Sequence, residues 1–236
     1  MWEALGWGVV AASSLVIGAV LGVVRQWKPS QIGVVLGFGA GALISSISFE
    51  LFEEGLATGG ALPLAFGLAT GALAFFFADR GVERLGGRLG AGSAGLPLAL
   101  GALLDGIPEQ AVLGLGIAQG DGVSVALLVA IFVSNLPESI GSSTDMRAAG
   151  DSARRIITLW TVVAAACTLA TVCGYAISRI TAERFEAAVD GFAAGALLVM
   201  LVGSMIPEAT EKAAKDKAGL AAVLGFAVAA GLSGIS

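Results

Sequence analysis

The feature that most constrains this chain is a succession of long apolar stretches. A bilayer core needs about 20 mostly apolar residues per helix, and soluble domains rarely contain one such stretch. Hydrophobic residues make up 56% of the 236 and charged residues 13%, whereas soluble domains are about 25% charged. We therefore expect an all-α membrane protein with eight transmembrane helices, at Ala4–Val24, Ile32–Leu51, Ala61–Ala78, Leu96–Ala118, Val123–Ser142, Ile156–Ile177, Ala187–Ile206 and Ala218–Ile235.

The basic residues predict how these helices cross the membrane. Eleven of the 13 Lys and Arg residues fall in the loops between the first and second, third and fourth, fifth and sixth, and seventh and eighth stretches. Only Arg179 and Arg184 fall on the opposite side. Because Lys and Arg concentrate in cytoplasmic loops, both termini are expected outside the cytoplasm. We expect a multi-pass protein of the inner or plasma membrane.

A short motif occurs twice, at an offset of 154 residues. GFGAGAL at Gly37–Leu43 recurs as GFAAGAL at Gly191–Leu197, and the same offset pairs Glu54 with Glu208, each just past the end of its helix. The copies lie in the second and seventh stretches, which cross in opposite directions, so they indicate an inverted repeat, as in secondary transporters. Small-residue helix packing alone also favours such strings. We expect three helices, a central pair and three inverted helices within one integral domain, residues 1–236.

We expect acidic residues deep in the membrane only in the fourth and fifth stretches. Asp105 and Glu109 are four residues apart and share one helix face, and Ser134 and Glu138 repeat that spacing, with Asn135 beside them. Each of these Glu residues follows a proline, which removes a backbone donor and frees a carbonyl at membrane depth. A charge at mid-bilayer costs roughly 2.5–3.5 kcal/mol, so such residues are functional hypotheses by default.

Carboxylates on adjacent antiparallel helices repel each other unless a proton or a cation lies between them. No Lys or Arg falls within the eight stretches, so a divalent cation is the natural counter-charge. We predict a metal site formed by Asp105, Glu109, Ser134, Asn135 and Glu138. The alternative is that the carboxyl groups are protonated and hydrogen-bonded between helices, with the prolines acting only as kinks.

These residues resemble the signature of the ZIP (Zrt/Irt-like) family of divalent-metal transporters. The family motifs in the fourth and fifth spans are His-Asn-x-Pro-Glu/Asp-Gly and His/Gln-Asn/Glu/Asp-x-Pro-Glu/His; here the chain has DGIPE at Asp105–Glu109 and SNLPE at Ser134–Glu138. The resemblance implies eight spans, both termini outside, a three-plus-two-plus-three inverted repeat and two metal positions. It assigns Asp105, Glu109, Ser134 and Glu138 to the first metal. Asn135, with Glu109 and Glu138 bridging, would remain for a weaker or lost second one.

The chain contains no histidine, so Asp105 stands where the family usually has the fourth-span His. A ligand set made only of oxygen favours hard cations such as manganese, magnesium, iron(II) or calcium. The resemblance instead implies zinc and iron. Zinc, iron(II) and manganese therefore all stay open as the transported ion.

Further acids mark a candidate entrance and exit. Glu50, Glu53 and Glu54 end the second stretch, where an outer vestibule would concentrate cations; ordinary solvated helix-end charges are the alternative. Glu208 is a candidate exit residue, although Lys212 and Lys215 nearby favour surface ion pairs instead.

We expect a transporter that moves divalent cations, inward, between the fourth and fifth helices, and not an enzyme. The chain has no His, no G-x-S-x-G motif and one deep Asp, so a membrane hydrolase would lack its reactive groups. The alternative is a ZIP-like scaffold that transports another solute or only binds or senses cations. Expected partners are membrane lipid and divalent cations, with no nucleic acid, and a homodimer is compatible with the sequence.

Overall fold

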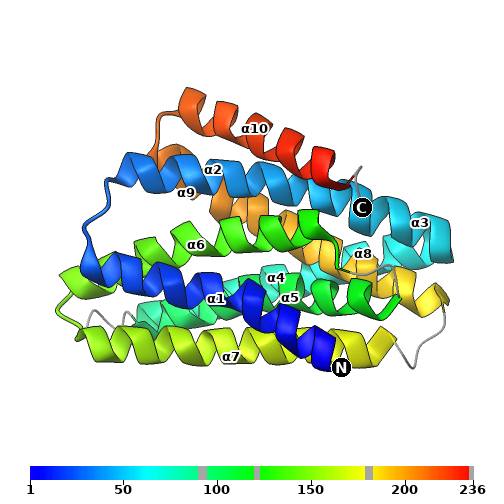
Figure 1. The fold of residues 1–236 in the computed structure, drawn as a ribbon, viewed down its shortest axis with the longest axis horizontal. Coiled ribbons are helices and arrows are strands. Elements are labelled where there is room, and N and C mark those ends of the chain that lie inside the picture. Colours follow the sequence, from blue (N-terminus) through cyan, green and yellow to red (C-terminus); the bar gives the residue numbers. More distant parts are fainter. Residues whose placement is uncertain (90–94, 120–122, 179–182, 234–236) are drawn as a thin grey trace.

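The computed structural model is helical throughout the residues it describes, which are 1–89, 95–119, 123–178 and 183–233 (Figure 1). Within them, eight helical segments are long and apolar enough to cross a bilayer, which confirms the expected fold class. Two short π-helices, η1 and η3, interrupt the second and seventh of these segments. The elements are α1 (Trp2–Val24), α2 (Pro29–Ser46), η1 (Ile47–Glu53), α3 (Glu54–Gly59), α4 (Ala61–Leu89), α5 (Gly95–Gln119), α6 (Val125–Ala148), α7 (Ala153–Ser178), α8 (Glu183–Met200), η3 (Leu201–Met205), α9 (Ile206–Lys212) and α10 (Lys215–Ser233).

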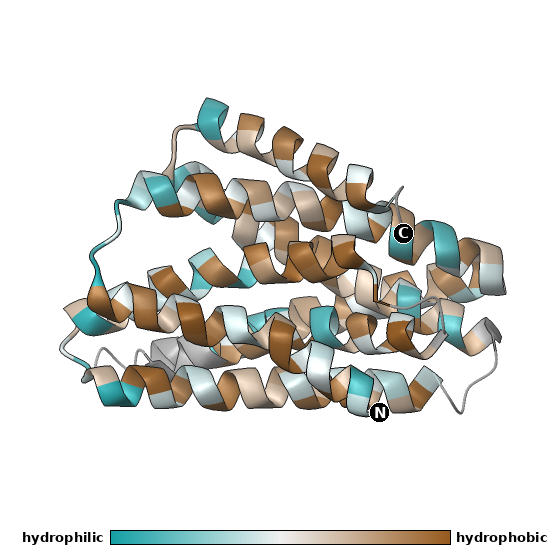
Figure 2. Cartoon of the chain, in the orientation of Figure 1, coloured by the Kyte–Doolittle hydropathy of each residue, from teal (hydrophilic) through white to brown (hydrophobic). Residues whose placement is uncertain are grey.

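Large apolar side chains cover much of the outer surface. Leu62 is 85% exposed and Phe66 and Val223 are each 69% exposed. Figure 2 shows hydrophobic residues along the helices, with hydrophilic ones gathered near their ends and connections. An apolar surface of this extent needs lipid rather than water around it.

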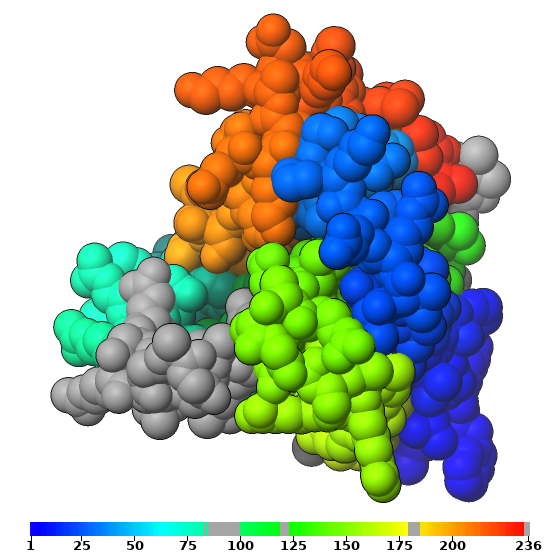
Figure 3. Space-filling view, turned by 90° about the vertical axis from the view of Figure 1, so that its left-hand side faces the viewer, coloured from blue at the N-terminus to red at the C-terminus, as the bar shows by residue number. Residues whose placement is uncertain are grey.

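The bundle is built from helix pairs. α2 packs against α10, α4 against α8, α5 against α7, and α1 against both α6 and α7. Both termini lie at the same end of the bundle, as an even number of crossings requires (Figure 1). The opposite end carries the α1–α2 connection and the start of α10, and Figure 3 shows that end face-on. We call these the terminal end and the basic end, because most Lys and Arg residues lie in the helix ends and connections at the latter.

The helix boundaries repeat at the offset found in the sequence. Three kinds of element begin 154 residues apart: the second and seventh spans, their π-helices, and the spans that follow them. These starts are Pro29 and Glu183, Ile47 and Leu201, and Ala61 and Lys215.

The contacts between these helices repeat at the same offset. Gly41 of α2 lies against the backbone carbonyl of Ala222 in α10, and Gly195 of α8 lies against that of Leu68 in α4. A side chain at either glycine would collide with the facing backbone. Small residues therefore allow the same close helix contact at two places in the bundle.

The π-helices are the main feature that the sequence did not predict. The chain stays helical beyond each of them, as α3 and α9, so the second and seventh spans are longer than expected. Glu54 begins α3 and Glu208 lies within α9. The prediction that these two residues follow the ends of their helices is therefore wrong. π-helical turns often occur at functional positions in long helices.

Candidate metal site

The predicted acids of α5 and α6 share one environment. Both helices remain continuous through Pro108 and Pro137. Asp105 is close enough to Glu109 for their charges to interact, and Glu138 interacts electrostatically with each of them. The structure thus brings the three carboxylates of the DGIPE and SNLPE motifs into one neighbourhood inside the bundle.

Glu109 is the most buried member of this group, with 1% of the residue exposed. Ser134 Oγ of α6 donates a hydrogen bond to Glu109 Oε1 at 3.2 Å. Glu109 Oε2 is buried and has no hydrogen-bond partner among the described residues. A buried carboxylate oxygen without a partner is costly, so this atom is the one on Glu109 that is available to a ligand or a proton.

Asn135 lies beside the same carboxylate. Its side chain interacts with Glu109, the residue is 1% exposed, and its Nδ2 makes no hydrogen bond within the described part of the chain. A half-turn of the amide would present Oδ1, an oxygen that hard cations accept, in place of Nδ2. Asn135 can therefore either face the carboxylate or face an ion.

A glycine on α2 lets a third helix close over this site. A Cβ at Gly39 would lie 2.9 Å from Ser134 Cα, which is closer than side chains tolerate. The α2 backbone therefore lies directly on α6 at the Ser134 turn. This contact covers α6 at Ser134.

The acidic side chains of α5 and α6 do not form a preformed metal site. Across the ranges that the structure describes, no three His, Cys, Asp or Glu side chains are arranged to hold one ion together. Glu109 has Ser134 and Asn135 as its polar neighbours, while Asp105 and Glu138 are half-buried. An ion at this place would keep water ligands or draw the half-buried carboxylates inward.

Towards the basic end, acidic groups continue from this site. Glu208 of α9 interacts electrostatically with both Asp105 and Glu138. Its Oε1 also pairs with Lys212 Nζ at 2.7 Å, so the predicted ion pair is present. The lysine lies against Gly141, one turn of α6 beyond Glu138. The structure thus places the candidate exit residue next to the predicted metal site.

Towards the terminal end, the three predicted entrance residues differ in surroundings. Glu50 is half-buried, and its Oε1 accepts hydrogen bonds from Ser124 Oγ at 2.7 Å and Ser233 Oγ at 2.9 Å. Glu53 is exposed. Glu54 is half-buried and interacts electrostatically with Asp190 of α8. The acids at this end therefore are not uniformly solvated helix-end charges.

Two buried polar residues were missed from the sequence. Asp190 is 4% exposed, so a buried acid also occurs near the start of the seventh span, outside the α5–α6 pair. Gln110 is fully buried, and its Oε1 accepts a hydrogen bond from Thr171 Oγ1 at 2.6 Å. Their positions in the sequence could have indicated both residues, because Asp190 falls inside the predicted seventh stretch and Gln110 directly follows Glu109.

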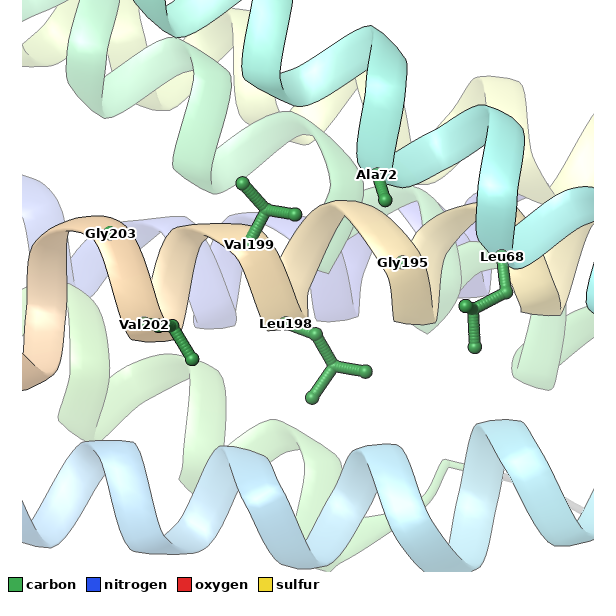
Figure 4. A pocket seen from close by; sticks show the side chains of 7 residues that line it. All are labelled: Leu68, Ala72, Gly195, Leu198, Val199, Val202 and Gly203. Carbon is green, nitrogen blue, oxygen red and sulfur yellow. The ribbon is translucent and has the colours of Figure 1, made fainter.

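A pocket of about 380 Å³ between α4 and α8 offers no ligand for a cation. Its lining is apolar, with the side chains of Leu68, Leu198 and Val202 around it (Figure 4). Two small residues, Ala72 and Gly203, leave room there. At the offset of 154 residues these positions correspond to Phe226 and Phe49, whose rings pack with centroids 6.1 Å apart in the other half of the molecule.

Comparison with known proteins gives one informative similarity. No protein-family model matches the chain. Over an alignment of 235 positions, which covers 94% of the chain, it is 27% identical to an Arabidopsis thaliana protein named "Putative zinc transporter". It spans only 37% of the length of that relative. Together with the eight apolar helices, this similarity identifies the chain as a multi-pass membrane protein.

Proposed function

We propose that this chain transports divalent metal ions across a membrane, through the carboxylate site between α5 and α6. The observation that carries the proposal is Glu109, whose one oxygen is held by Ser134 and whose other oxygen is buried without a described partner, next to Asp105 and Glu138. Carboxylates gathered in a bilayer need a proton or a cation between them, and a divalent cation satisfies several of them at once. The name of the Arabidopsis relative and the ZIP-like motifs make zinc the first substrate to test.

Each residue of the proposed site has its own role in binding the ion. Glu109 and Glu138 supply charge that replaces the ion's hydration, Asp105 takes the position of the family's histidine, and Ser134 orients Glu109. Asn135 supplies a neutral oxygen. Because all of these ligands are oxygens, the ion would be held less tightly than by thiolates or imidazoles, which suits a site that must release its cargo.

The direction of transport and the sidedness belong to the proposal. The concentration of Lys and Arg at the basic end supports a cytoplasmic basic end and extracytoplasmic termini. The acids that run from Glu138 to Glu208 support release on the same side, and hence inward transport. We propose that residues 1–236 act as one transport domain in an inner or plasma membrane, with the α1–α4 and α7–α10 groups moving around the central pair.

Zinc uptake by the reconstituted chain tests the proposal. The chain is placed in vesicles that contain a zinc-sensitive dye, and uptake is compared with that of Glu109→Gln and Glu138→Gln. Each substitution removes one ligand charge with little change of shape, so uptake should fall at least about tenfold. Asp145→Asn is the matched control, since it removes an exposed carboxylate from the same helix. Undiminished uptake by Glu109→Gln would refute the site.

The same experiment separates transport from sensing. A scaffold that only binds cations would show zinc-dependent thermal stabilisation, which depends on Glu109, without any uptake. A carrier of another solute would show neither effect. The proposal requires both stabilisation and uptake, and both must be lost in Glu109→Gln.

A further inference from the structure

We propose that the apolar pocket between α4 and α8 binds an acyl chain of an anionic phospholipid, whose phosphate lies against Arg80 and Arg84 of α4. This lipid site does not depend on the metal site between α5 and α6. It goes beyond the general lipid contact of a membrane protein, because one pocket and two nearby cations select both parts of the same molecule.

The pocket is an indentation of the lipid-facing surface. It has a volume of about 380 Å³, and the residues that line it come from α4, α8 and η3 (Figure 4). All of them are apolar or glycine. Two of them, Val202 and Leu198, are 68% and 38% exposed, so the pocket is open to the surroundings of the bundle. An open apolar space of this kind in a bilayer is filled by hydrocarbon rather than by water.

The other half of the molecule fills the corresponding place with its own side chains. There Phe226 and Phe49 stand at the positions of Ala72 and Gly203, and their rings pack against each other. A Cβ built on Gly203 would meet nothing within 4 Å. One half therefore leaves open a space that the other half occupies with two rings, and an acyl chain can supply the missing apolar contacts.

Two cations lie on α4 beyond the pocket, towards the basic end. Arg80 follows Ala72 by two helical turns, about 12 Å along the axis. Its guanidinium lies over the ring of Phe76, with Cζ 4.0 Å from the ring centroid, and Phe76 is one turn from Ala72. The charge of Arg80 is thus held on the side of its helix turn that faces the pocket.

These cations are available to an anion. Arg80 and Arg84 are exposed, and neither forms an ion pair within the part of the chain that the structure describes. Asp79, which precedes Arg80, acts on Asp105 inside the bundle. Arginine binds phosphate through several parallel N–H donors, so a phosphate is the anion that this pair of residues suits.

The depth of these arginines also suits a lipid head group. The apolar span that contains the pocket residues Leu68 and Ala72 ends at Val82, so Arg80 and Arg84 lie at its basic-end boundary. A phospholipid has the same order, with hydrocarbon in the bilayer core and phosphate at its edge. Basic groups beside clefts between transmembrane helices bind anionic head groups in this way.

Lipid retention, measured by native mass spectrometry on the full chain in detergent, tests the proposal. The delipidated chain is offered equal amounts of dioleoylphosphatidylglycerol and dioleoylphosphatidylcholine, which share their acyl chains and differ in net charge. We expect one phosphatidylglycerol to be retained in preference by at least about tenfold, since each arginine near an anionic head group contributes about fivefold. Equal retention of the two lipids would overturn the proposal.

A variant that fills the pocket tests the acyl-chain half of the site. Ala72→Phe/Gly203→Phe should abolish the retention of phosphatidylglycerol and its effect on the unfolding temperature, because the rings occupy the place of the chain. Gly231→Phe is the control, since it adds a ring at an exposed position of α10 where a Cβ meets nothing within 4 Å. If a second copy of this chain occupies the pocket instead, filling it will lower the fraction of dimer and leave lipid retention unchanged, which contradicts the proposal.

A second variant tests the head-group half without altering the pocket. Arg80→Gln/Arg84→Gln should still retain a lipid but lose the preference for phosphatidylglycerol. Arg25→Gln/Arg154→Gln removes two other exposed cations from the same end and should keep that preference. This arm adds no volume to the bundle, so it decides the question even if the filled variant does not fold. A preference that survives the loss of Arg80 and Arg84 would refute the site.

Discussion

The two halves of the molecule share a backbone plan and differ in the side chains placed on it. α2, η1, α3 and α4 in one half correspond to α8, η3, α9 and α10 in the other, with glycines at the same helix contacts. Near the ends of these elements the side chains differ: Glu208 forms an ion pair with Lys212 in one half, and Glu54 interacts electrostatically with the buried Asp190 in the other. The glycine contacts between helices are thus shared by the two halves, while the charges are not.

This difference shows where each kind of constraint acts. Backbone contacts across small residues fix how the helices pack, so they permit little variation. Side chains near the helix ends are free to differ, and there the terminal end has accumulated acids while the basic end has accumulated Lys and Arg. The terminal and basic ends therefore present different charges, although the two halves share one backbone plan.

The largest effect is expected from breaking the shared contact in each half. Gly41→Leu and Gly195→Leu each place a side chain against a facing backbone carbonyl, so each should lower the free energy of unfolding by about 1–3 kcal/mol. Thermal unfolding in detergent measures the loss. Gly6→Leu is the control, because a side chain there meets nothing within 4 Å. A large loss in one half only would contradict the equivalence of the two contacts.

A smaller loss of stability is expected at Glu50, because its counterpart in the other half is the uncharged Ser204. Glu50→Ala removes the acceptor for Ser124 and Ser233 and should cost about 1–2 kcal/mol, since hydrogen bonds to charged groups are among the stronger ones. Its counterpart Ser204→Ala should cost less than about 0.5 kcal/mol. Amide hydrogen exchange should accelerate at the start of α6 and the end of α10 in the first variant alone. Equal exchange in both variants would show that Glu50 does not tie these helices together.

Filling the apolar pocket should raise the free energy of unfolding by a similar amount. Ala72→Phe with Gly203→Phe copies the ring pair of Phe49 and Phe226 into the other half and fills the space between α4 and α8. Filling a pocket typically adds about 0.5–2 kcal/mol, so the double variant should unfold at a higher temperature. A lower unfolding temperature would mean that the pocket walls are shaped differently from their counterparts.

The smallest effect on stability is expected from removing the ion pair. Lys212→Gln removes a partly exposed pair between residues four apart, which contributes about 0.3–0.5 kcal/mol. Thermal unfolding in detergent measures the loss, and a loss well above about 1 kcal/mol would contradict this account of the pair.

The sequence predicted the elements that depend on local pattern. The eight spans follow from the lengths of the apolar stretches, and the neighbouring positions of Asp105 and Glu109 follow from helical spacing. The offset of 154 residues, first seen in two short motifs, recurs in the helix starts. That the chain binds and carries metal through these acids stays a prediction.

What the sequence did not predict depends on long-range packing. A stretch that is apolar on every side does not distinguish an α-turn from a π-turn, so η1 and η3 left no pattern to detect. Glu50 meets Ser124 and Ser233 across 74 and 183 residues of chain. The contact of Asp190 with α3 likewise exists only once α3 and α8 pack together.

The most direct test of a metal site between α5 and α6 is anomalous X-ray scattering from crystals of the full chain soaked in zinc. Our account predicts a zinc peak within bonding distance, about 2.0–2.2 Å, of Glu109 Oε2, and its disappearance in Glu109→Gln. A zinc peak bound to other residues, with none beside Glu109, would contradict it.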